Sequence, residues 1–111
     1  MTEQPKSKDF RQTKAYRALR RDLLSSLAER GLDQEVYLDK VREYLDFWVR
    51  LQKLNADVDL RGLTVTDDRG RQTENRSVSL SVQVSRQMMA LFTALGFKAS
   101  DFMDAGGDDE L

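Results

Sequence analysis

One amphipathic stretch, residues 33–62, most strongly limits what this chain of 111 residues can fold into. Its apolar side chains recur at steps of four and three, the spacing of one face of an α-helix. That face comprises Tyr37, Val41, Tyr44, Trp48, Leu51, Asn55 and Val58. Further apolar residues lie outside it, namely Leu38, Leu45, Phe47, Val49 and Leu54. Because this surface is wider than a helix packed on one side requires, we predict a helix over residues 34–60, about 40 Å long, with more than one neighbour.

A second helix is expected before it, over residues 9–30. One face of that helix comprises Tyr16, Leu19, Leu23 and Leu27. Gly31 is suited to end this helix in a left-handed conformation, and Asp33 is suited to begin the next one as its N-cap. The connection between them is short, so we expect the two helices to be antiparallel neighbours.

Residues 63–97 carry two conflicting patterns. Thr-Val-Thr at 64–66 favours a short strand, and the turn sequence around Gly70 favours a hairpin or an ordered loop. From 77 to 85, apolar residues alternate with polar ones as in a strand, yet Val84 continues at helical spacing into the residues that follow. One helix over 77–96, ended by Gly96, accounts for the whole segment without a break, so we predict a helix although strand remains open for 77–85.

These elements together predict a mostly α-helical, three-helix subunit with a long central helix and a short β-like hairpin or loop between the second and third helices. We expect residues 1–8 to be disordered, because they are polar and carry the only proline. Residues 9–97 would form one helical domain for oligomerisation and DNA binding, and residues 98–111 a flexible acidic tail.

Composition argues against catalysis. Cysteine and histidine are both absent, which removes thiol nucleophiles, the usual general base and the commonest metal ligands. We therefore predict no catalytic residue, no metal and no cofactor. The chain contains neither an apolar run long enough to span a membrane nor a signal-peptide pattern at its start, so the expected compartment is the cytoplasm and no membrane partner is expected.

The width of the apolar face on residues 34–60 allows two interpretations. The helix is either the centre of a three-helix monomer or is shared between its own subunit and a neighbour. Aromatic side chains are enriched at interface cores, which favours the second interpretation. The predicted oligomer interface comprises Tyr44, Phe47, Trp48 and Leu51.

The two ends of the chain differ in charge. Residues 1–30 hold eight Lys/Arg and four Asp/Glu, whereas 101–111 hold five acids and no base. On the first predicted helix, Lys14, Arg17 and Arg21 fall within an arc of about 60°, flanked by Arg11 and Arg20. This basic row is either a DNA-phosphate contact or an ordinary solvated face.

The acidic end also allows two interpretations. It is either a docking peptide with apolar anchors or a frayed terminus that aids solubility. The residues assigned to docking are Asp101, Phe102, Met103, Asp108, Asp109 and Glu110.

The order of these segments resembles the small subunit of tailed-phage terminases, in one of its short families. The resemblance covers about residues 14–111. It rests on Tyr-Arg-Ala-Leu-Arg-Arg-Asp-Leu-Leu from Tyr16, Tyr-Leu-Asp-Lys-Val-Arg-Glu-Tyr-Leu-Asp-Phe-Trp from Tyr37, Arg-Gly-Leu-Thr-Val from Arg61, Gln-Met-Met-Ala-Leu-Phe-Thr-Ala-Leu-Gly-Phe-Lys from Gln87 and the terminal Asp-Asp-Glu-Leu. The chain departs from many relatives in lacking a separate helix-turn-helix region and in having Arg76 after Asn75, where relatives often have proline.

The resemblance implies a ring-forming, all-helical adaptor for viral DNA packaging. Such a protein binds double-stranded viral DNA and recruits or regulates the large terminase subunit, which carries the ATPase and the nuclease. It would act in the host cytoplasm and would not be a virion component. The alternative is an oligomeric helical scaffold for protein interactions that does not bind nucleic acid.

Overall fold

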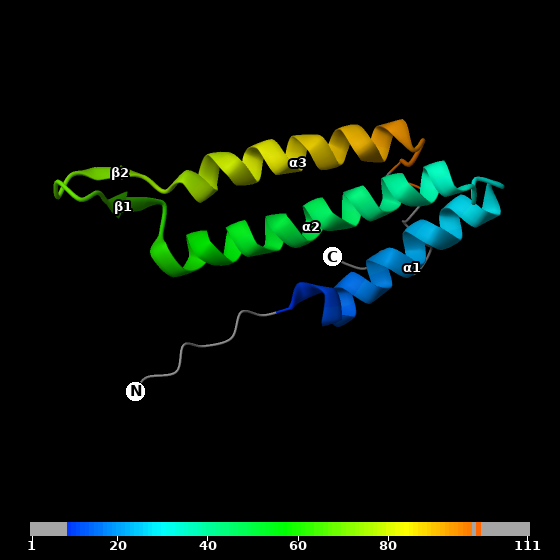
Figure 1. Cartoon of the computed structure of the whole chain (residues 1–111), viewed down its shortest axis with the longest axis horizontal. Coiled ribbons are helices and arrows are strands. Elements are labelled where there is room, and N and C mark those ends of the chain that lie inside the picture. Colours follow the sequence, from blue (N-terminus) through cyan, green and yellow to red (C-terminus); the bar gives the residue numbers. More distant parts are fainter. Residues whose placement is uncertain (1–8, 99, 101–111) are drawn as a thin grey trace.

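A computed structural model describes residues 9–98 and 100, which form three helices and one small hairpin (Figure 1). A 3-10 turn, Phe10–Gln12, comes first. The helices are α1 (Lys14–Glu29), α2 (Glu35–Arg61) and α3 (Arg76–Ala94). The strands β1 (Thr64–Thr66) and β2 (Gln72–Glu74) pair antiparallel between α2 and α3. The predicted fold class is confirmed, and residues 77–85 are helical.

The helices form an uneven bundle. Figure 1 shows α3 running back along α2, whereas α1 covers only the first half of α2, which begins at Glu35. The hairpin lies at the opposite end of the molecule, beyond the reach of α1. The second half of α2 and the first half of α3 therefore form a two-helix layer, and no third helix of the described residues covers it.

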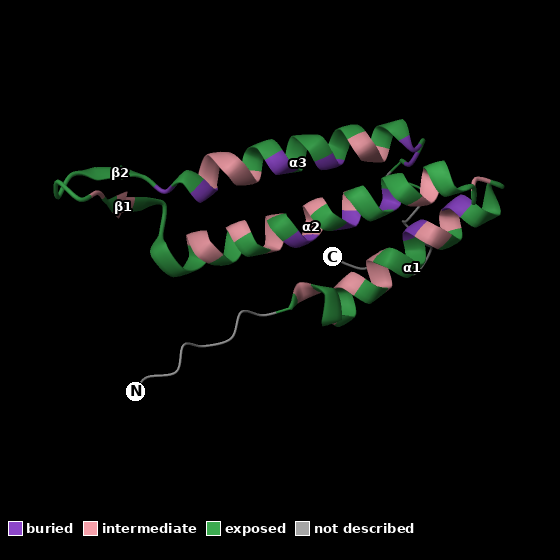
Figure 2. Cartoon of the chain, viewed as in Figure 1, coloured by how far each residue is buried: buried purple, intermediate pink, exposed green. Residues whose placement is uncertain are grey.

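The core lies where all three helices meet (Figure 2). Its fully or nearly fully buried side chains are Leu23, Leu27, Val41, Leu45, Leu95 and Phe97. On α2 the buried line runs through Val41, Leu45 and Val49, which is rotated from the face that the sequence pattern singled out. The rotation follows from packing, because α2 must turn one side to α1 and an adjoining side to α3.

Two predicted helix starts are wrong. Thr13 has an extended backbone and its Oγ1 accepts a hydrogen bond from Tyr16 N, so α1 begins at Lys14 instead of continuing from Asp9. Asp9 caps the short preceding turn by accepting from Arg11 N. The N-cap of α2 is Gln34, not Asp33, and its side chain makes no capping bond. Leu32 packs against the core within the connection between α1 and α2. The helix α2 then begins at Glu35, one residue after the predicted start.

A glycine follows the end of each helix, and the two predicted ones, Gly31 and Gly96, are confirmed. Gly31, Gly62 and Gly96 all have positive φ, which residues with a Cβ rarely adopt. The end of α3 is also tied to α1, because Arg30 Nη2 donates to Leu95 O at 2.8 Å and its guanidinium lies over the Phe97 ring.

A polar cluster closes the base of the hairpin. Asn75 is fully buried; its Nδ2 donates to Gly62 O at 3.0 Å, and its Oδ1 accepts from Ser77 N at 3.0 Å and from Arg61 at 3.2 Å. Arg61 also donates twice to Asp57, at 2.7 and 2.8 Å, and Ser77 Oγ donates to the same carboxylate. The Arg61 and Ser77 hydrogen bonds hold the pKa of Asp57 below its usual range. The cluster joins the end of α2 to the start of α3.

Candidate nucleic-acid interface

The solvent-facing side of α1 carries a row of cations. Lys14, Arg17 and Arg21 are exposed, and the buried Leu23 and Leu27 lie on the opposite side of the same helix. Steps of three and four residues stack these side chains along successive turns. The row is therefore presented by a rigid helix that its own core contacts hold in place.

Among the described residues, most of this row has no acidic partner. Arg21 Nε lies 3.4 Å from Asp22 Oδ1, and both side chains are more than half exposed. Such a pair contributes little, because water screens it. Lys14 and Arg17 form no ion pair with another residue that the structure describes. The face keeps cations available to a polyanion.

The other two predicted DNA contacts lie apart from the row. Arg11 belongs to the turn before α1 and donates to Asp46 of α2 at 2.9 Å, which raises the pKa of Arg11. Arg20 lies in a groove between α1 and α2, where Tyr16 and Arg42 also line the wall. The sequence pattern missed Arg42, because a helical period reveals the neighbours on one helix and not those on the next.

The four predicted interface residues divide into two pairs. The Tyr44 ring lies tilted against Phe92 with ring centroids 6.2 Å apart, and the Trp48 ring lies tilted against Tyr16 at 5.8 Å, so both pack within their own subunit. Phe47 and Leu51 instead line surface grooves on either side of the contact between α2 and α3.

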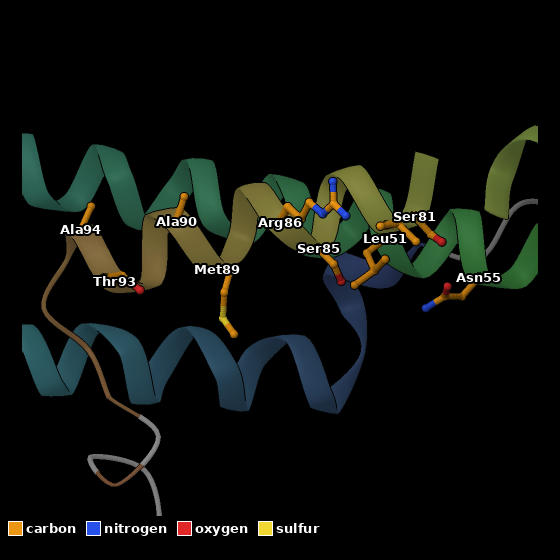
Figure 3. Close-up of a pocket in the computed structure, with 10 residues that line it drawn as sticks. Leu51, Asn55, Ser81, Ser85, Arg86, Met89, Ala90, Thr93 and Ala94 are labelled. Atoms are coloured by element: carbon orange, nitrogen blue, oxygen red, sulfur yellow. The ribbon is translucent and has the colours of Figure 1, made fainter. Parts of the chain in front are cut away.

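An apolar groove runs along α3. Its wall includes Leu51 and Asn55 from α2 and small side chains of α3 such as Ser81, Ser85 and Ala90 (Figure 3). Met89 projects from α3 in this region and is 67% exposed. Val82 recurs seven residues before Met89 and is 47% exposed, so this side of α3 faces outward.

The docking residues predicted between 101 and 111, and the disordered segment predicted at 1–8, lie outside the described residues. In the part of the chain that is described, no three His, Cys, Asp or Glu side chains gather as a metal site. Within the same residues no helix is both long and apolar enough to cross a membrane.

The three antiparallel helices define a small, mostly helical protein that exposes a cationic face and an apolar groove. A family model described as phage terminase, small subunit, matches residues 17–106, so the chain belongs to that family. The predicted family is therefore confirmed, and the role of the chain lies in phage DNA packaging. Among curated proteins and solved structures, none matches the chain significantly.

Proposed function

We propose that this chain is a homo-oligomeric adaptor that binds double-stranded viral DNA and recruits the large terminase subunit in the host cytoplasm. In this proposal the ATPase and the nuclease belong to the large subunit, and this chain is not catalytic. The acidic segment from Asp101 to Glu110 docks the large subunit, with Phe102 and Met103 as apolar anchors. Membership of the terminase small-subunit family supports the packaging role.

The exposed face of α1 is the observation that carries the DNA-binding part of the proposal. Lys14, Arg17 and Arg21 point away from the core and have few acidic neighbours. Lysine and arginine side chains that meet DNA phosphates release condensed counterions, and this release favours binding at low salt. Arg11 and Arg20 flank the face and extend the contact once their present neighbours are displaced.

Oligomerisation gives these few contacts their strength. A single subunit offers only a handful of phosphate contacts, so its affinity for DNA is weak. When several copies of the face act on one duplex, each later contact benefits from a high effective concentration. A ring places such copies at regular intervals, which suits a long, uniformly charged ligand.

The test is the salt dependence of DNA binding by the purified oligomer. Affinity for a viral duplex should fall steeply between about 50 mM and about 300 mM salt, because bound counterions must be released. The variant Lys14→Gln, Arg17→Gln, Arg21→Gln should bind more weakly, and its slope of log affinity against log salt should shrink by about 0.9 for each phosphate that the variant no longer neutralises. Fluorescence anisotropy on a labelled duplex measures both quantities.

A charge-matched variant separates a specific face from net charge. Lys53→Gln, Arg69→Gln, Arg76→Gln removes three exposed cations that form no ion pair with any described residue, so its net charge equals that of the α1 variant. It should retain the wild-type slope. Equally weakened binding in the two variants would mean that the α1 face is not the interface. An oligomer that binds DNA at neither salt concentration would instead favour the protein-interaction scaffold.

A further inference from the structure

The groove between α1 and α2 combines an apolar floor with basic walls. Its volume is about 360 Å³. Arg20 of α1 and Arg42 of α2 line it and are exposed. Asp46 is the only acid among the described residues of its wall, and Arg11 pairs with it at 2.9 Å. The apolar residues that line the groove are Leu24, Leu38, Val41 and Leu45. Such a wall suits an acidic peptide with apolar anchors, because apolar contact supplies binding and charge sets orientation.

The two arginines of the groove are accessible to such a peptide. Arg20 forms no ion pair with another residue that the structure describes. Arg42 Nη2 lies 2.6 Å from Glu35 Oε2 and 3.6 Å from Asp39 Oδ1, but the Arg42 side chain is 57% exposed. Water screens exposed pairs of this kind, so they contribute little and are readily exchanged for another carboxylate.

Residues 101–104, Asp-Phe-Met-Asp, have the composition that this groove requires. Two large apolar side chains stand between two acids. No lysine or arginine occurs in residues 99–111, which as a whole carry five acids. The segment therefore matches the groove both in apolar character and in sign of charge.

The length of chain between Phe97 and Phe102 is sufficient to reach the groove. Phe97 lies at the end of α1, since the Arg30 guanidinium is 5.0 Å from the centre of its ring. From Arg30 back to Leu24 is about 9 Å along the helix, and crossing the helix adds a diameter of about 10–12 Å, so the direct path is about 15 Å. Five extended residues span up to about 17 Å.

We propose that residues 101–104 bind in the α1–α2 groove of their own subunit. Phe102 and Met103 would pack on its leucines, and Asp101 and Asp104 would meet its two arginines. This inference rests on the proposed function, in which Phe102 and Met103 also anchor the large subunit. One pair of anchors cannot occupy both sites, so the groove competes with the large subunit for the segment.

Competition of this kind restrains docking. Because the groove and the segment belong to one chain, each meets the other at a high effective concentration, and a weak contact suffices. A segment that is bound about nine-tenths of the time weakens the apparent affinity for the large subunit about tenfold. Lys14, Arg17 and Arg21 do not line the groove, so the DNA-binding row stays exposed while the segment is bound.

Disulfide trapping in the full-length chain tests the contact itself. The chain has no cysteine, so the pair Leu38→Cys, Met103→Cys has no competing thiol. The matched pair Val36→Cys, Met103→Cys uses a residue of the same helical turn that is 62% exposed and lies outside the groove. With oxidised glutathione as the oxidant, the Leu38 pair should close at least roughly tenfold faster, because the groove holds the segment beside it.

Each rate is divided by the rate at which the corresponding single thiol reacts with glutathione, and the mass of the denatured chain identifies the bond as intrachain. Equal corrected rates for the two pairs would mean that the segment does not favour the groove. A covalent dimer in place of the intrachain bond would mean that the segment reaches a second copy. Either result overturns the proposal and leaves the DNA-packaging role standing.

Charge reversal in the groove wall tests the competition. Arg42→Glu places a carboxylate where the acids of the segment bind, and Lys40→Glu makes the same change of net charge on the same helix outside the groove. Arg42→Glu should slow the trapping of Leu38→Cys, Met103→Cys and tighten binding of the large subunit about threefold to tenfold, whereas Lys40→Glu should change neither. Biolayer interferometry measures the affinity, and far-UV CD verifies that both variants are folded.

The contrary results separate this inference from the proposed function. Weaker binding of the large subunit by Arg42→Glu alone would assign the groove to the large subunit and would overturn the competition. A wild-type chain that does not bind the large subunit, although the groove pair is trapped faster, would contradict the docking part of the proposed function and leave the intramolecular contact standing.

Discussion

Asn75 shows how one residue joins three parts of this fold. It caps the start of α3. Its side chain also donates a hydrogen bond to the carbonyl of Gly62 at the end of α2 and accepts one from Arg61 at the same end. An amide is suited to this position because it both donates and accepts. The sequence pattern around Asn75 suggests only a loop residue, because its partners come from another element.

Replacing Asn75 with alanine should lower the free energy of unfolding by about 1–3 kcal/mol, because buried donors and acceptors are left without their partners. Asn75→Asp retains the acceptor for Ser77 N but places a buried carboxylate oxygen against Gly62 O and beside Asp57, so at neutral pH it should destabilise at least as much as Asn75→Ala. Urea unfolding monitored by CD measures both changes.

Ser79→Ala is the control for this series, since the Ser79 hydroxyl donates only to the Arg76 carbonyl of its own helix. Its effect should stay within about 0.5 kcal/mol. If Asn75→Ala were equally mild, the hairpin base would be held by the chain connection and the Asp57–Arg61 pair alone.

At the scale of elements, sequence patterns located the helices but not all of their ends or faces. Leu23 and Leu27 were assigned correctly to the buried side of α1, because one neighbour covers one face. On α2 the pattern predicted a buried face that is rotated from the observed one through Val41, Leu45 and Val49. Two helices, α1 and α3, cover adjoining faces of α2, and the apolar spacing reflects both contacts together. For the candidate site, helical spacing correctly placed the Lys14, Arg17 and Arg21 row on one exposed face, but it did not show that Arg20 and Arg42 line the same groove.

The helical state of α3 should depend on packing against α2. The segment contains Val78, Val82 and Val84 as well as several serines, all of which favour helix less than the Ala, Leu and Arg residues of α1. A peptide of residues 75–96 should therefore show less helix by far-UV CD than one of residues 13–31, although it is longer. Equal or greater helicity in the α3 peptide would mean that local preference alone decides this element.

The whole molecule separates its surfaces by element. The cationic face belongs to α1, the apolar groove runs along α3, and α2 packs against both helices. The described residues end beside the junction of α1 and α2, where Arg30 contacts Leu95 and the Phe97 ring.

Deleting residues 101–111 should test whether these functions are separable. Under the proposed function, the shortened chain should no longer co-purify with the large subunit, while its oligomeric mass and its salt-dependent DNA binding remain those of the full chain.

Two full-length variants then separate the apolar from the charged contribution to this docking. Phe102→Ala, Met103→Ala removes the apolar anchors, and Asp108→Asn, Asp109→Asn, Glu110→Gln removes charge without shortening the segment. If the apolar anchors dominate, the first variant should abolish most of the binding and the second should mainly slow association, because charge steers encounter more than it holds a complex. A deletion that lowers the oligomeric mass would instead assign the segment to assembly of the subunits and would contradict a purely docking role.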